Sequence, residues 1–467
     1  MNEFKTYLLW ALSLLAAAAL LTLLWPREAE TDAEAAALAE GRVMITHWDR
    51  HSGHEHAERL KFIEEFNRAQ HEVYVRSIAI GYAATMEKVL TSTAGGAPPD
   101  LASLDSGFVA QLAPQGVFLP LDDFVASEPS LHEDQYFPHC WDMAWLDGHV
   151  WGIPSTTDAY CLLWNKKAFR EAGLDPEQPP RTLRELEEFA ARLQVRTPVG
   201  RVERMGFVPW LPWDHTYLWG GIFGGEWYDP VRDAVDLSNQ PAIAASLAWQ
   251  QSFTYLSAAE PHAAYALPVA EVDGFSEGAR DYFSTNNPFY SGQVAMIVEG
   301  EWQVTFISRY APGFEWGVAP VPQPENIPPS AYGPTGILDV IPATARHADA
   351  AKTFLRWFYT KRGPGLTSPA SDYNFVIHNI PPRREEAAEP RFSGNPKFRV
   401  FVEQLDRPRI ITYPVMPVAQ YLLDQHLRQM ERVILHEVSP EQAVQEMESM
   451  INKELRRVRE QVRRGKQ

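Results

Sequence analysis

The sequence predicts an α/β protein whose mostly parallel sheet is covered by helices on both faces. Short apolar segments rich in β-branched residues alternate with segments in which apolar residues recur at helical spacing. Strands that alternate with helices along a chain pair into parallel sheets buried between layers of helices. With 467 residues, the chain is long enough for two or three globular units of about 150 residues each.

The order of elements is clearest in the first third of the chain. Residues 42–46 (RVMIT) form a short apolar run and residues 72–80 (EVYVRSIAI) alternate in polarity, so both predict strands. Between them, Leu60, Ile63 and Phe66 recur at helical spacing. The predicted order is a strand at 42–46, a helix at 56–70, a strand at 72–80, a helix at 81–93 and a strand within 98–105 (PPDLASLD).

Three later helices are also predicted from local patterns. Residues 182–185 form a capping box ahead of a helix at 183–193, whose apolar residues share one face. A second helix is predicted around residues 351–358, and a last one begins at Pro440. Residues 318–334 (VAPVPQPENIPPSAYGP) are rich in proline and predict a crossing segment.

The amino terminus predicts a membrane segment. Residues 7–25 (YLLWALSLLAAAALLTLLW) hold 19 positions without a charge, about the length that spans a bilayer as a helix. Lys5 precedes this run, which favours an amino terminus left in the cytoplasm and export of the remainder. We expect residues 1–41 to be an uncleaved membrane anchor with a spacer, and a cleaved signal segment is the alternative. The body would then lie at the extracytoplasmic face of the cell membrane.

The overall charge argues against nucleic acid as a partner. The chain has 42 Lys and Arg against 60 Asp and Glu, a formal net charge of −18, and such a protein is repelled by phosphate backbones. Its two cysteines, Cys140 and Cys161, are too few for a disulfide scaffold or a four-cysteine zinc site. They could form one disulfide in an oxidising compartment or remain two buried thiols.

The sequence lacks the motifs of an exported hydrolase. It contains no G-x-S-x-G, H-E-x-x-H, G-x-x-x-x-G-K or C-x-x-C pattern, so we expect no enzyme activity, no catalytic residue and no cofactor. A cluster of His47, His51, His54 and His56 has the composition of a metal site. Neighbouring polar residues in a loop and a first helical turn are usually solvated, however, and no metal is expected.

Several segments, in order, resemble one known family. Residues 147–174 (DGHVWGIPSTTDAYCLLWNKKAFREAGL) and 180–193 (PRTLRELEEFAARL) are similar to its G-I-P strand, its L-x-x-N-K strand and its P-x-T-W-x-E helix start, with Leu183 where the family usually has Trp. Residues 289–303 (FYSGQVAMIVEGEWQ) resemble its F-x-x-G-x-A-A-M-x-x-x-G-x-W box. Further similar segments are 59–76, 98–124, 315–324 and 333–358. The family is that of the extracellular solute-binding proteins of ABC importers, which includes maltose-binding protein and other sugar receptors.

This resemblance implies a two-lobe periplasmic-binding-protein fold of type II, with the ligand in a cleft between two α/β lobes. The first lobe would take residues 42–155 with 333–400, and the second 156–332 with 401–467. It implies an extracytoplasmic receptor that binds a small solute, a carbohydrate, by lobe closure and delivers it to the membrane subunits of an ABC permease. A ligand-sensing module for a signalling partner and an extracytoplasmic glycan-active enzyme are the alternatives.

The candidate ligand-binding residues lie in loops that this fold would turn toward the cleft. A sugar presents CH faces and hydroxyl edges, so its receptor needs flat aromatic faces together with polar donors and acceptors. For each tryptophan the alternative role is core packing, and for Asp49 and Asp105 it is helix capping. The candidates are Trp48, Asp49, Asp105, Ser155, Thr156, Tyr160, Trp213, Trp219, Glu299, Trp302, Gly333 and Thr335.

Overall fold

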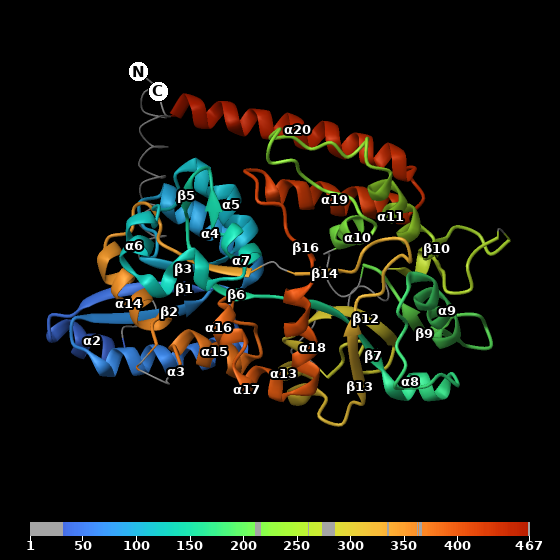
Figure 1. Ribbon diagram of the computed structural model, residues 1–467, viewed down its shortest axis with the longest axis horizontal. Helices are drawn as coiled ribbons and strands as arrows, with labels where there is room; N and C mark the ends of the chain where they lie inside the picture. The colour runs from blue at the N-terminus through green and yellow to red at the C-terminus, as the bar shows by residue number, and fades with distance from the viewer. Residues whose placement is uncertain are drawn as a thin grey trace, which may run out of the picture.

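Two β-sheets, each with a hydrophobic core of its own, organise the computed structural model (Figure 1). The predicted membrane segment at residues 7–25 lies outside the described residues. The structure describes residues 31–210, 216–259, 261–272, 285–333, 336–361, 363 and 367–465. Across these ranges, no helix combines the length and the apolar composition that a membrane crossing requires.

The first sheet has the strand order β2-β1-β3-β15-β6. Strands β1, β2 and β3 are parallel, and β15 runs antiparallel to both β3 and β6. Helices α4 and α5 lie above this sheet in Figure 1, and α3, α14 and α15 lie below it. The bounds are β1 Val43–Asp49, β2 Val73–Ala79, β3 Leu101–Asp105, β6 Ile153–Thr157, β15 Gly336–Val340, α3 Gly53–Ala69, α4 Tyr82–Ala94, α5 Ser106–Leu112, α14 Ala348–Tyr359 and α15 Pro369–Ile377.

The second sheet has the order β16-β14-β7-β12-β9-β8, and β13 pairs with β7 beside it. Helices α9, α10, α11, α13, α18, α19 and α20 carry residues of its core. The strand bounds are β7 Tyr160–Asn165, β8 Val195–Arg196, β9 Val202–Phe207, β12 Val294–Gly300, β13 Trp316–Pro320, β14 Ser330–Tyr332 and β16 Arg409–Ile411. The helix bounds are α8 Lys166–Glu171, α9 Leu183–Leu193, α10 Tyr217–Ile222, α11 Pro241–Gln251, α13 Gln303–Tyr310, α18 Pro396–Val402, α19 Ala419–Ile434 and α20 Pro440–Gly465.

We refer to the first sheet with its helices as the first lobe and to the second sheet with its helices as the second lobe. The chain passes from the first lobe to the second between β6 and β7, returns between β14 and β15, and passes to the second lobe again between α15 and α18. The remaining described helices and strands are shorter. They are α2 Asp32–Ala39, α6 Asp122–Ser127, α7 Pro138–Asp142, β4 Trp145–Leu146, β5 His149–Val150, β10 Thr254–Tyr255, β11 Leu267–Pro268, α16 Arg384–Ala387 and α17 Pro390–Gly394.

The structure confirms most predicted elements, but it corrects the predicted mostly parallel sheet and the end of the first strand. Both large sheets are mixed, because β15 runs antiparallel to β3 and β6, and β7 runs antiparallel to β12, β13 and β14. The helix predicted at 183–193 is α9, and the last helix begins at Pro440 as expected. The first strand was predicted to end at Thr46, but β1 continues to Asp49. It continues because His47 and Asp49 are fully buried and have polar partners inside the first lobe, which offsets the cost of burying polar groups.

Candidate ligand-binding cleft

The polar side of the candidate site begins where parallel strands of the first sheet end. In an open α/β sheet, ligands bind outside the carboxyl ends of the strands, and β1 and β3 end at Asp49 and Asp105. Arg50 follows β1 and forms a bidentate ion pair with Asp105, with Nε–Oδ2 and Nη2–Oδ1 distances of 3.0 Å. The Arg50 side chain is 27% exposed and that of Asp105 is 12% exposed. This pair can therefore present hydrogen-bonding groups to a ligand.

Neighbouring carboxylates keep the Arg50 guanidinium protonated. Burial alone would lower its pKa, but Asp105 first and then Asp158 and Glu55 act in the opposite direction, and the pKa is raised above its usual value. Asp158 lies in the segment that crosses between the lobes, so the electrostatic field at Arg50 includes a carboxylate from this crossing.

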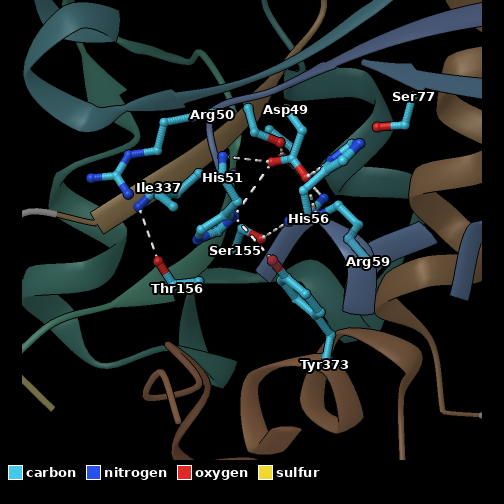
Figure 2. A network of polar contacts seen from close by, with 12 residues as sticks. Asp49, Arg50, His51, His56, Arg59, Ser77, Ser155, Thr156, Ile337 and Tyr373 are labelled. Atoms are coloured by element: carbon cyan, nitrogen blue, oxygen red, sulfur yellow. Dashed lines mark hydrogen bonds and ion pairs between the residues drawn. The ribbon is translucent and has the colours of Figure 1, made fainter. Parts of the chain in front are cut away.

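The Asp49 side chain lies in a buried polar network of the first lobe. Its carboxylate accepts a 3.0 Å hydrogen bond from the His51 backbone N–H and lies 3.0 Å from His56 Nδ1 (Figure 2). Burial would raise its pKa, but Arg59 and the hydrogen bonds from both histidines hold it well below the usual range. Asp49 is fully buried, and its carboxylate orders the segment before α3, whose N-cap residue is Ser52.

Arg59 is the cation at the centre of this buried network. Its Nε lies 3.5 Å from Asp49, and its Nη1 lies 3.7 Å from Asp339 in β15. Its guanidinium also lies over the rings of Phe358 and Tyr373, at 5.1 and 4.7 Å from their centroids. Because the side chain is 0% exposed, Arg59 joins β1, α3, α14, α15 and β15 and does not reach a ligand.

Two more predicted residues support the same interior. Ser155 and Thr156 lie within β6 and are buried. The hydroxyl of Ser155 accepts a bond from Arg59, and that of Thr156 accepts one from the Ile337 backbone N–H (Figure 2). Trp48 is half-buried and packs against the first core.

The second lobe contributes an aromatic group at the facing edge. Tyr160 begins β7, opposite Gly300 at the end of β12. Its ring meets that of Trp302 edge-on at 5.5 Å between centroids. A Cβ at Gly300 would lie 2.2 Å from the Trp302 ring, so only glycine lets the indole lie over the strand end. Glu299 is fully buried and accepts a hydrogen bond from Gln303 at 2.8 Å.

Three tyrosines extend this group, and none of them was among the candidates. Tyr332 at the end of β14 lies 4.6 Å from Tyr160 between ring centroids, and Tyr217 meets both Tyr332 and Tyr413 at 5.7 and 5.6 Å. The hydroxyl of Tyr332 donates to that of Tyr217. Burial raises the pKa of Tyr160 and of Tyr332 well above the usual value, so both phenols stay protonated and able to donate. The sequence could have indicated Tyr332 through its position next to Gly333, which is a predicted site residue.

The two crossing segments lie against each other beside these tyrosines. A Cβ at Gly333 would lie 3.2 Å from the Asp158 carbonyl oxygen, a tight approach. The Ala159 backbone N–H donates to Glu301 Oε2 at 3.0 Å. Burial, and after it the charge of Asp158, raises the pKa of Glu301 well above its usual value. Predicted residues Trp213 and Thr335 lie outside the described residues.

Trp219 lies in the second core. It is 1% exposed, its Nε1 donates to the Pro209 carbonyl at 2.9 Å, and its ring lies 4.6 Å from that of Trp249. Gly220 and Gly221, which follow Trp219, belong to α10. A Cβ at Gly220 would lie 2.6 Å from the Trp227 ring, so glycine permits close helix packing here.

The two lobes touch in this structure. The His54 ring at the start of α3 meets Phe306 of α13 edge-on, with 5.2 Å between centroids. At the start of α5, a Cβ on Gly107 would lie 2.6 Å from the Tyr413 ring. The Arg50–Asp105 pair and the Tyr160–Trp302 group therefore lie at the facing edges of two lobes in contact.

One buried constellation has the residue types of a hydrolase site. His47 Nε2 lies 2.9 Å from Ser103 Oγ, and Ser103 donates to Asp339 at 2.5 Å. All three residues are 0% exposed. Asp339 accepts a hydrogen bond from the serine hydroxyl, whereas the aspartate of a catalytic triad bonds to the histidine and orients it. Among the described residues, no group of three or more His, Cys, Asp or Glu side chains is arranged to hold a metal ion.

Comparisons of this chain with known proteins agree on one family. The family model described as "Bacterial extracellular solute-binding protein" matches residues 54–363. An uncharacterized ABC transporter extracellular-binding protein of Pyrococcus horikoshii is 20% identical over 72% of this chain and 69% of its own. The sn-glycerol-3-phosphate-binding periplasmic protein UgpB of Escherichia coli K12 is 27% identical over 49% of each chain.

Solved structures agree with this result. CpMnBP1 with mannotriose bound has a TM-score of 0.76 and 25% identity, covering 87% of this chain and 99% of that one. The maltose/maltodextrin-binding domain MalE of Bdellovibrio bacteriovorus, bound to maltotriose, has a TM-score of 0.70 over 89% of this chain and all of that one, and its 17% identity shows the fold alone. This chain belongs to the family of bacterial extracellular solute-binding proteins.

Proposed function

We propose that this protein is the extracytoplasmic solute-binding subunit of an ABC importer and that its solute is a carbohydrate. Family membership supports the first part. The second part is supported by CpMnBP1, which holds mannotriose and resembles 87% of the length of the present chain. Residues 7–25 would anchor the subunit in the membrane beside its permease, and tethering would raise the local concentration at that partner.

One observation carries the proposal: a polar ion pair and an aromatic group lie at the facing edges of the two lobes. Arg50 and Asp105 come from the first lobe, and Tyr160 and Trp302 come from the second. Carboxylate and guanidinium groups suit sugar hydroxyls, and aromatic faces suit the CH surfaces of a sugar ring. A solute that touches both groups would be bound only when the lobes are together, and this differential affinity would drive closure.

This assignment divides the residues of the site into three sets. Arg50, Asp105, Asp158, Tyr160 and Trp302 would contact the solute, and Trp48, Trp213, Glu299, Gly333 and Thr335 remain proposed contributors. Asp49, Ser155, Thr156 and Trp219 would support the site from the interior, because the first three are held in the first lobe by polar contacts and Trp219 packs on Trp249.

Isothermal titration of the full chain in detergent, with mannobiose, mannotriose, maltotriose and glycerol 3-phosphate, tests the function. We expect one of the sugars to bind, and Trp302→Ala to weaken that binding by about 1–3 kcal/mol, as for a buried aromatic anchor. Tyr255→Ala, which removes a ring stacked on His262 in the short strand β10, is the control and should bind as the wild type does. Binding of glycerol 3-phosphate alone would contradict the carbohydrate assignment.

The location has its own test. Membranes from cells that express the full chain should retain it after a high-salt wash, and the purified protein should keep its first 25 residues by mass spectrometry. Release into the soluble fraction together with loss of these residues would show a cleaved signal segment.

A further inference from the structure

The last helix links the two lobes. In Figure 1, α20 lies along the second lobe beside α19 and extends toward the first lobe. Near its carboxyl end, Arg459 Nη1 donates to Asp147 Oδ2 at 2.7 Å, and Arg459 Nε donates to Asp233 Oδ2 at 2.9 Å. Asp147 lies between β4 and β5, whereas Asp233 is close to α20 itself. One guanidinium therefore joins carboxylates from two different parts of the fold.

The hairpin that carries Asp147 is fixed to the first lobe. Asp147 and Gly148 form the two-residue turn between β4 and β5, with φ angles of 52° and 87°, as such tight hairpin turns require. The Val150 backbone N–H donates to Asp122 at 3.2 Å, and the Val150 carbonyl accepts from the Leu121 N–H at 2.7 Å. A shift of the first lobe would therefore move the Asp147 carboxylate with it.

Asp233 is fixed to the second lobe and to α20. Its carboxylate accepts a hydrogen bond from the Tyr228 hydroxyl at 2.6 Å. Two residues later, Val235 exchanges backbone hydrogen bonds with the Asn452 side chain of α20, at 3.0 and 2.6 Å. Arg459 is thus held on the second lobe by Asp233 and reaches across to the first lobe through Asp147.

The space beside this contact is not closely packed. A cavity of about 690 Å³ is lined by Trp145 and Leu146 of the hairpin on one side and by Tyr228, Ile411 and Tyr413 on the other. Close-packed interfaces resist sliding because shifted side chains collide, and a cavity of this size removes that resistance. The Arg459–Asp147 ion pair beside this cavity then contributes more to the relative position of the two lobes.

The Arg459–Asp147 ion pair includes none of the proposed solute contacts, although Tyr413, which lines the cavity, also extends the aromatic group. Arg50 and Asp105 follow β1 and β3, whereas the hairpin immediately precedes β6, the edge strand beyond β15. In the second sheet, Trp302 follows β12, whereas the cavity is lined by β16, the edge strand beyond β14.

We propose that Arg459 and Asp147 form an interlobe clasp that stabilises the arrangement seen here, with the lobes touching at His54 and Phe306, and so raises solute affinity without contacting the solute. Interactions present in one arrangement and absent from another shift the balance toward the first. The clasp is a property of the unliganded protein and does not depend on which solute binds.

Interlobe distances in the unliganded protein test the clasp directly. Spin labels at Arg68→Cys in α3 and Val199→Cys in the second lobe occupy exposed positions, and both native cysteines are buried. Pulsed electron resonance should show a shift toward different or broader distances in Arg459→Met and in Asp147→Asn, with Arg459→Lys closer to the wild type. The matched control is Arg457→Met, because Arg457 pairs with Glu454 on its own helix. An unchanged distribution in Arg459→Met would overturn the proposal.

Affinity provides the second readout. For mannotriose, Arg459→Met should raise Kd by about two- to fivefold, the range expected for a partly exposed ion pair. The double variant with Asp147→Asn should match the single variants, and the difference should shrink in 0.5 M salt because of screening. If none of the three sugars binds, the proposed carbohydrate function fails while the distance measurement still decides on the clasp. Equal Kd values in Arg459→Met and the wild type would contradict the proposed clasp.

Discussion

His47 shows how a single buried side chain makes stability depend on pH. Its Nδ1 lies 2.9 Å from Ser77 Oγ and its Nε2 lies 2.9 Å from Ser103 Oγ, so both ring nitrogens have neutral partners. Burial, the largest effect, lowers its pKa from 6.5 to about 4. The unfolded chain therefore takes up a proton below about pH 6.5, while the folded protein does not until about pH 4.

This difference predicts a loss of stability in mild acid. The contribution of His47 is complete above pH 6.5 and is lost as the pH falls toward 4, at about 1.4 kcal/mol per pH unit. Urea unfolding of His47→Gln should show a slope between pH 6 and 4.5 that is shallower by about one proton. His71→Gln, at a side chain that is 79% exposed, should keep the wild-type slope. If both variants kept it, His47 would be charged in the folded state.

At the scale of elements, the contact between α9 and β9 shows what a local pattern can specify. Thr182 accepts a hydrogen bond from the Glu185 backbone N–H at 3.1 Å, as the capping pattern predicted. The Glu185 carboxylate instead accepts from the Arg181 N–H. The approach of the strand to this helix depends on Gly206, where a Cβ would lie 2.0 Å from the Ala190 carbonyl oxygen. Nothing in the local sequence around Gly206 indicates this partner.

Gly206→Ala is therefore expected to destabilise the protein strongly. A Cβ cannot fit against a helix backbone without separating α9 from β9, and overpacking of this kind costs about 3 kcal/mol. Gly313→Ala is the matched control, because nothing lies within 4 Å of a Cβ there, and it should change the free energy of unfolding by less than about 0.5 kcal/mol. Denaturant unfolding measures both, and equal stabilities would mean that the strand moves away freely.

At the scale of the whole molecule, the two cysteines report on the two lobes. Cys140 lies in α7, near the first lobe, and Cys161 lies in β7 of the second sheet. Both are free and fully buried, which decides between the disulfide and the two thiols that the sequence left open. Burial raises the pKa of Cys140 to about 12 and that of Cys161 well above its usual value.

Both thiols should therefore be unreactive in the native protein. With a thiol reagent at pH 8, we expect neither cysteine to react on the time scale in which a free thiol does, because the thiolate is the reactive form. In guanidinium chloride without reductant, two thiols per chain should react. A count of zero in denaturant would show a disulfide, and rapid native labelling would show that one lobe opens easily.

The order of elements, the α/β class and the family follow from the sequence alone. These depend on local periodicity and on the order of motifs, which a chain carries whatever its partners in space. The helix at 183–193 and the start of the last helix at Pro440 were predicted at their observed positions for this reason. The aromatic group was found in part, through Tyr160 and Trp302.

Which polar residues could face a solute depends on tertiary packing. Asp49 ends β1 and Arg50 follows it, yet Asp49 points into the first lobe toward His51 and His56, while Arg50 turns the other way toward Asp105. Successive side chains of an extended segment point to opposite sides, so a candidate that is wrong by one residue lies on the wrong face. Which face is the cleft depends on how the second lobe packs, and contacts such as Tyr217–Tyr332 and Arg459–Asp147 join residues 115 and 312 positions apart. No local pattern encodes such pairs, because they join segments that are far apart in the chain and meet only in the folded protein.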